Sequence, residues 1–149
     1  MRALLQLKYR PNRRLAKIMG KWLAGMVLKT NWNAKIIIPV PLGEARKKQR
    51  GYNQAELIAQ EMARELMLPC EPNYLMRIRE TNSQVGLVPI QRWKNVAGAF
   101  ITTSSIKGIE GVILVDDLRT TGATLSSCAY TIRQAGGRRV CAATVAQAR

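Results

Sequence analysis

The segment from Gly111 to Thr124 (GVILVDDLRTTGAT) contains the residue types and the spacing best suited to chemistry. An apolar run leads into Asp116 and Asp117, so we expect a buried strand to deliver two adjacent carboxylates to its carboxyl end, where open α/β sheets bind ligands. Two neighbouring carboxylates repel each other and need hydroxyl donors or a cation beside them. Neighbouring hydroxyls of a ribose, with Mg²⁺ close by, would meet that need.

The next residues, Thr120, Thr121, Gly122, Ala123 and Thr124, form a turn of small side chains that opens a predicted helix. A helix N-terminus binds anions through its backbone N–H groups and the positive end of its dipole, and the threonine hydroxyls add donors. Gly122 would let the backbone approach a phosphate closely. The alternative is an ordinary strand–turn–helix capped by threonine. An acid pair and a small-residue turn at this spacing favour a ribose 5-phosphate site, and the chain contains neither a GxxxxGK loop nor a GxGxxG pattern.

The elements that must position this segment alternate between apolar strands and amphipathic helices. The strands are expected at residues 35–40, 74–78, 111–115 and 140–145, and the helices at 13–28, 53–66 and 124–135. Between residues 82 and 98 we expect a loop with at most one helical turn, at 90–95. Such alternation is typical of βαβ units with a mostly parallel sheet, which predicts a single α/β domain over residues 1–149.

The first predicted helix has an apolar face and a basic face, and Asn12 is placed to cap it. We expect its apolar residues to turn toward the core and its basic residues to face outward. The apolar set is Leu15, Ile18, Met19, Trp22, Leu23 and Met26, and the basic set is Arg14, Lys17 and Lys21. In the second helix, Asn53 and Glu56 stand at the spacing of a capping box.

Charge and residue usage restrict the function further. The chain carries 24 Lys and Arg against 9 Asp and Glu, a net charge of +15, and it has no His. The charge has two interpretations, a well-solvated basic surface or a polyanionic partner such as nucleic acid. Without His, acid–base catalysis by His and metal sites built on His are excluded.

The cysteines and the apolar segments indicate where the protein works. Cys70, Cys128 and Cys141 are widely spaced without a CxxC pair, so they suit a reducing compartment and small buried positions rather than disulfides or zinc. The chain contains no uninterrupted run of 18 apolar residues, so the sequence predicts no transmembrane helix. The apolar pair near the start is too short for the core of a signal peptide, and we expect a cytoplasmic protein.

The stretch VILVDDLRTTGAT strongly resembles the phosphoribosyl pyrophosphate signature of type I phosphoribosyltransferases. Together with IPVPL, RGYNQAELIA, ETNSQVGL and RWKNVAGAF, in this order, it resembles the ComF family of competence-associated proteins over nearly the whole chain from Leu7. The signature alone identifies only the superfamily, whereas the other blocks are specific to ComF. The resemblance implies a type I phosphoribosyltransferase-like fold, with a mostly parallel sheet flanked by helices.

Carried over by position, the resemblance implies that Asp116 and Asp117 contact a ribose and that residues 120–124 contact its 5-phosphate. Pro41 and Leu42 occupy the place of the family's pyrophosphate loop. The remaining positions are Arg46, Lys47 and Arg50 near that loop, Asn53 at the next helix, and Gln84, Arg92 and Asn95 in a segment that is mobile in the family.

Several of these positions also have an interpretation that involves no ligand. Cations just beyond the end of a strand suit a pyrophosphate, but the charge-dense predicted loop at 42–52 could also be a solvated loop. Asn53 is either a ligand or only a helix cap.

The chain departs from the family pattern in two respects. ComF proteins usually begin with a cysteine-rich zinc ribbon, and no such cluster precedes Leu7, so we expect either a short form or a lost ribbon and no zinc in this chain. Purine-salvage phosphoribosyltransferases carry an acid at the position of Thr120. Because threonine is no general base at neutral pH, purine salvage is disfavoured.

Two functions remain open at this point. The first is a binding protein for phosphoribosyl pyrophosphate or a ribose 5-phosphate ester, with Mg²⁺, that works in DNA uptake beside competence proteins and single-stranded DNA; a homodimer is one assembly left open. Trp93, between Arg92 and Lys94, would stack on a DNA base or serve as a core or lid residue. The second is an active phosphoribosyltransferase, a glycosyltransferase of nucleotide metabolism, whose acceptor the sequence does not identify.

Overall fold

The computed structural model describes residues 7, 11–79, 96–104 and 108–148. Its centre is a parallel sheet of β1 (Ile36–Pro39), β4 (Gly111–Arg119) and β5 (Arg139–Gln147), in the order β1-β4-β5. Ile38 of β1 pairs with Leu114 of β4, which pairs in turn with Ala142 of β5. Cys70 adds a single parallel bridge to Ile37 on the outer side of β1. The predicted α/β architecture with a parallel sheet is therefore confirmed.

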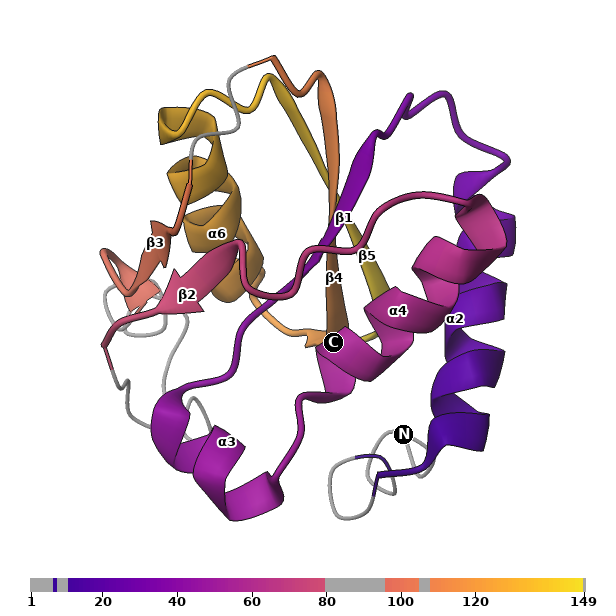
Figure 1. Cartoon of the computed structure of the whole chain (residues 1–149), viewed down its shortest axis with the longest axis horizontal. Coiled ribbons are helices and arrows are strands. Elements are labelled where there is room, and N and C mark those ends of the chain that lie inside the picture. Colours follow the sequence, from indigo (N-terminus) through magenta and orange to yellow (C-terminus); the bar gives the residue numbers. More distant parts are fainter. Residues whose placement is uncertain (1–6, 8–10, 80–95, 105–107, 149) are drawn as a thin grey trace.

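Helices cover both faces of this sheet, with α2 (Arg13–Val27) and α4 (Gln54–Leu66) on one face and α6 (Ala123–Gln134) on the other (Figure 1). Because side chains alternate along a strand, Ile113 points into the core beneath α2 and α4, and Leu114 points into the core beneath α6. This double coverage explains why the strands are continuous apolar runs. Within the described ranges, every helix is too short or too polar to cross a membrane.

A two-stranded antiparallel ribbon, β2 (Leu75–Arg77) and β3 (Phe100–Thr102), lies beside α6 (Figure 1). Ser127 of α6 donates a hydrogen bond to the Val96 carbonyl at 2.8 Å, which fixes the approach to β3. The strand expected at 74–78 is confirmed, whereas β3 was not predicted from the sequence. Most of the loop predicted at 82–98 lies outside the described residues.

The helix α2 confirms its predicted cap and half of its predicted core face, since Met19 and Leu23 are buried and Leu15 is half-buried against the core. The Asn12 side chain accepts a hydrogen bond from the Leu15 amide at 3.0 Å, as expected. The expected core residues Ile18, Trp22 and Met26 are instead exposed, at 58%, 53% and 50% of their surface. The prediction that they turn toward the core was wrong.

The reason is a face of small residues on α2. Ala16, Gly20 and Ala24 are buried at a spacing of four, and a Cβ added to Gly20 would lie 2.7 Å from the Cβ of Glu61 and 2.8 Å from the backbone nitrogen of Met62. α4 therefore packs directly against the backbone of α2. This close contact sets the rotation of α2 and turns the large apolar side chains outward.

Candidate functional site

The acid pair lies within β4, near its carboxyl end. The strand was expected to end at Val115, but its pairing with β5 continues to Arg119, so Asp116 and Asp117 are part of the sheet edge and half-buried. The carboxylate of Asp116 accepts a hydrogen bond from the Asp117 amide at 2.8 Å. This bond fixes one carboxylate at the carboxyl end of the parallel sheet, where ligands of such sheets bind.

The turn after β4 is capped by glycine rather than threonine. Gly122 is the N-cap of α6 with a φ of 82°, a left-handed conformation that favours glycine, and α6 begins at Ala123, one residue earlier than expected. The Thr121 hydroxyl accepts a hydrogen bond from the Ala123 amide at 3.4 Å. The alternative of a plain threonine cap is therefore not what the structure shows, and the turn places the positive end of the α6 dipole next to the acid pair.

The segment after β1 lies at the same end of the sheet as these carboxylates (Figure 1). The Val40 amide donates to the Val115 carbonyl at 2.9 Å, so Pro41 and Leu42 begin beside the residue that precedes Asp116. Both are half-buried. The structure thus brings the predicted pyrophosphate loop and the acid pair to neighbouring strand ends.

The cations predicted in a loop are instead in a short helix, α3 (Glu44–Arg50). Gly43 is its N-cap, Gly51 ends it with a left-handed φ of 75°, and Glu44 and the cations suit opposite ends of its dipole. Arg46 and Arg50 stand four residues apart on one half-buried face, whereas Lys47 is exposed. The helix therefore carries two half-buried arginines on one side and an exposed lysine on another.

Asn53 joins the two halves of this region. Its side chain is buried, donates to the Val40 carbonyl at 3.0 Å and accepts from the Ala55 amide at 3.1 Å. It is thus the N-cap of α4 and also holds the end of β1. In the expected capping box Glu56 would return to this cap, but its carboxylate accepts instead from Gln60 at 3.2 Å. These bonds favour the cap over the ligand role.

Sequence reasoning missed Arg119, the last residue of β4. Its Nε lies 3.5 Å from the place a Cβ would take on Gly122, so the guanidinium lies beside the small-residue turn. Asp117 and Arg119 are two residues apart on one strand and share a face, a spacing that could have identified it. Three other candidates, Gln84, Arg92 and Asn95, lie outside the described residues, as does Trp93.

Comparison with known proteins places this arrangement in a family. The chain is 40% identical over 102 residues to competence protein F of Haemophilus influenzae, a match that covers 67% of this chain and 44% of that protein. The chain belongs to the ComF family. This ComF chain is also 29% identical over 140 residues to the DNA utilization protein YhgH of Escherichia coli K12, covering 91% of this chain and 61% of YhgH. It is 31% identical over 103 residues to competence protein ComFC of Bacillus subtilis, covering 68% of this chain and 39% of ComFC.

The chain thus spans only part of the length of these relatives, between 39% and 61%. No protein-family model matches it. The resemblance to ComF, which the RGYNQ block and its companion blocks made specific, is confirmed by the named relatives.

Solved structures show that this ComF chain has the phosphoribosyltransferase fold. The glutamine phosphoribosylpyrophosphate amidotransferase of B. subtilis superposes with a TM-score of 0.58 at 20% identity, over 87% of this chain and 26% of that one. A purine phosphoribosyltransferase from Pyrococcus horikoshii superposes with a TM-score of 0.51 at 14% identity, over 89% of this chain and 73% of that one. The predicted fold class is confirmed.

The cysteines of this ComF chain are held as thiols. Burial, with the negative charge of Asp116 nearby, raises the pKa of Cys128 well above its usual value, although Arg77 opposes the shift. Burial likewise raises the pKa of Cys70 to about 11. Since the thiolate is the nucleophilic form, neither side chain is prepared for attack at neutral pH. Neither thiol is therefore a candidate nucleophile for this site.

Proposed function

We propose that the chain binds phosphoribosyl pyrophosphate, or another ribose 5-phosphate ester, at the carboxyl end of β4. The observation that carries the proposal is the pair Asp116 and Asp117, half-buried at the sheet edge and followed after one short turn by the Gly122-capped start of α6. The carboxylates would accept hydrogen bonds from ribose hydroxyls. The 5-phosphate would accept hydrogen bonds from the turn at residues 120–124.

The basic residues that follow β1 would bind the pyrophosphate. Pro41 and Leu42 lie at the neighbouring strand end, and Arg46 and Arg50 form the half-buried face of α3. A planar guanidinium binds phosphate oxygens with two parallel hydrogen bonds, which makes these arginines better suited than Lys47. Arg119 adds a further cation at the turn itself.

A magnesium ion fits this arrangement only together with a substrate. Among the residues described, no three His, Cys, Asp or Glu side chains gather as a metal cage. Mg²⁺ binds with one or two carboxylates plus substrate phosphates, and Asp116 and Asp117 would be the protein's share. When bound, Mg²⁺ would shield the negative charge of the pyrophosphate from these carboxylates.

The role that we propose for the whole protein is in DNA uptake, in the cytoplasm. Its support is the names of the relatives, which are competence and DNA utilization proteins. Turnover is the alternative: a nucleophile would form a bond to the anomeric carbon while the bond from that carbon to pyrophosphate breaks, and pyrophosphate would leave with the electron pair. Positioning and charge stabilisation supply most of such a reaction. Burial raises the pKa of Cys70 and Cys128, and threonine is no general base at neutral pH. The acceptor would therefore have to react without a proton being removed by these cysteines or by Thr120.

Calorimetry with phosphoribosyl pyrophosphate tests the proposal. We expect binding in the presence of Mg²⁺ that weakens at least about tenfold with a chelator, because two carboxylates and a pyrophosphate then meet unshielded. Asp117→Ala should also weaken binding. Equal affinity with and without the chelator would count against the magnesium role, and an unchanged affinity in Asp117→Ala would reject the site.

Single-stranded DNA binding is a second candidate, favoured by the exposed cations of α2. Arg14, Lys17 and Lys21 all face solvent as expected, although Lys21 also lies 3.2 Å from Glu65. Changing all three to Gln should reduce the salt slope of single-strand affinity by about two, at roughly 0.7 for each phosphate that is no longer neutralised. Filter binding across a salt series measures the slope. An unaltered slope in the folded variant would mean that these cations are ordinary solvated surface.

A further inference from the structure

The outer face of α2 carries an apolar stripe that the protein core does not use. Ile18, Trp22 and Met26 are at least half-exposed and follow one another at a spacing of four residues. At 1.5 Å per residue they form a continuous line about 12 Å long. A line of three large apolar side chains on one helix marks an interaction site rather than scattered surface residues.

Packing fixes this stripe in its outward position. The close approach of α4 to Gly20 opposes a rotation of α2 that would bring the stripe inward, since even a Cβ at position 20 would lie 2.8 Å from the backbone nitrogen of Met62. Leu23 and Met19 already fill the core beneath α2. The stripe therefore points away from the core, and any partner for it lies outside the described residues.

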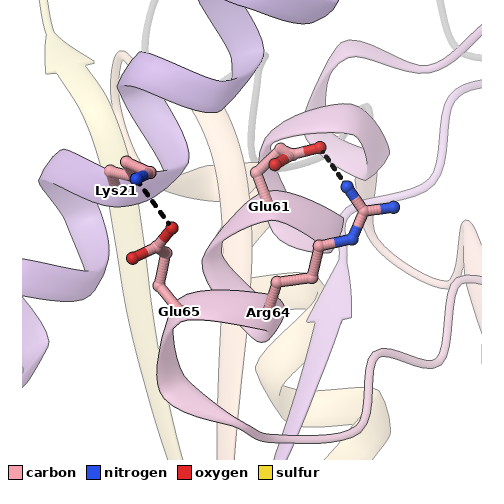
Figure 2. A network of polar contacts seen from close by, with 4 residues as sticks. All are labelled: Lys21, Glu61, Arg64 and Glu65. Atoms are coloured by element: carbon pink, nitrogen blue, oxygen red, sulfur yellow. Dashed lines mark hydrogen bonds and ion pairs between the residues drawn. The ribbon is translucent and has the colours of Figure 1, made fainter.

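The charged residues of α2, the helix that carries the stripe, are all basic. Residues 1–43 contain nine Lys and Arg and no Asp or Glu. Two carboxylates of α4 lie beside α2, and both are paired: Glu65 with Lys21 at 3.2 Å and Glu61 with Arg64 at 2.6 Å (Figure 2). Arg14 and Lys17 lie in solvent next to the stripe. The occupant must therefore combine an apolar interior with a negative rim.

We propose that α2 docks on an anionic lipid surface. Ile18, Trp22 and Met26 would insert below the headgroups, and Arg14 and Lys17 would contact lipid phosphates, as in helices that lie in the plane of a bilayer interface. A second copy of the chain fits less well, because two basic faces would meet and the neighbouring Glu65 is already paired with Lys21. Nucleic acid fits less well because Ile18 and Met26 cannot stack on bases, and phosphates alone need only the cations.

Flotation with lipid vesicles tests this proposal. The unmodified chain should bind vesicles of phosphatidylcholine and phosphatidylglycerol in equal parts, should not bind pure phosphatidylcholine, and should dissociate as salt rises. The variant Ile18→Ser/Trp22→Ser/Met26→Ser should bind the mixed vesicles about 100-fold more weakly, at roughly a factor of five for each half-exposed side chain. Because all three positions are outside the core, the variant should keep the thermal unfolding of the unmodified chain.

The matched control is Met67→Ser/Tyr130→Ser, which removes apolar side chains exposed at 91% and 67% on other elements and should bind lipid like the unmodified chain. The proposal is overturned if the mixed vesicles are not bound, or if the stripe variant binds them as well as the control does. It is also overturned if the stripe variant loses single-strand DNA affinity or self-association while no lipid binding is detected. A loss of DNA affinity would identify the stripe as a stacking surface, and a loss of self-association would identify it as a contact between copies.

Discussion

Replacing Gly122 by Val is expected to lower the affinity for phosphoribosyl pyrophosphate by at least about 100-fold, which corresponds to about 2.7 kcal/mol. Gly122 has a φ of 82°, a conformation that a β-branched residue adopts only with strain of roughly 1–3 kcal/mol. A Cβ at this position would also approach Arg119 Nε to 3.5 Å, so the longer branches of valine would displace that guanidinium. The sequence suggested a direct clash with the phosphate; the structure indicates that the damage would come through the shape of the turn and through Arg119.

The matched control for this change is Gly108→Val. Gly108 also has a left-handed φ, of 91°, but a Cβ there would meet no atom within 4 Å, and it precedes β4 at the end opposite to the acid pair. The control should lose comparable stability and bind the ligand normally by calorimetry. If Gly122→Val bound as tightly as Gly108→Val, the phosphate could not lie against this turn.

Replacing Gly20 by Ala should lower the free energy of unfolding by about 2 kcal/mol. The added Cβ would lie 2.8 Å from the Met62 nitrogen and 2.9 Å from the Ile58 carbonyl oxygen, both backbone atoms, so α2 and α4 would have to separate. This loss should appear although alanine is the better helix former by about 1 kcal/mol. Urea unfolding followed by circular dichroism measures the change.

Gly25→Ala, on the same helix, should change the free energy of unfolding in the opposite direction. A Cβ at Gly25 would meet nothing within 4 Å, so only the helix propensity changes and stability should rise by up to about 1 kcal/mol. Equal effects of the two substitutions would show that α2 and α4 can readjust, and the fixed orientation of the stripe would then lose its support.

The sequence alone was sufficient for the parts of the fold that depend on local pattern. The strands β1 and β4 contain apolar runs, α2 and α6 have clear periodicity, and the acid pair follows the apolar run of β4 toward the carboxyl end of the sheet. The cap by Asn12 follows from the same local rule. These features are determined within a few residues, which is why they could be predicted.

The predictions from sequence failed where contacts between residues far apart in the chain determine the structure. The apolar pattern of α2 fits two rotations of the helix, and only the contact between Gly20 and α4 selects the one that exposes Trp22. The helix α3 was missed because charged residues without an apolar face show no period, although Gly43 and Gly51 delimit it. The bond from Asn53 to the Val40 carbonyl spans a turn and a helix, and no local pattern encodes it.

The pairing of β1 with β4 has a consequence for the assembly of the chain. Ile36 pairs with Val112, which lies 76 residues later, whereas Gly111 pairs with Arg139, only 28 residues later. Closing the longer loop costs about 0.9 kcal/mol more chain entropy than closing the shorter one. The acid pair and the turn that follows it thus belong to a local β4–α6–β5 unit. The strand β1, which leads into the arginines of α3, joins this unit only through the long-range pairing with β4. The two halves of the ligand site come together only when that closure is complete.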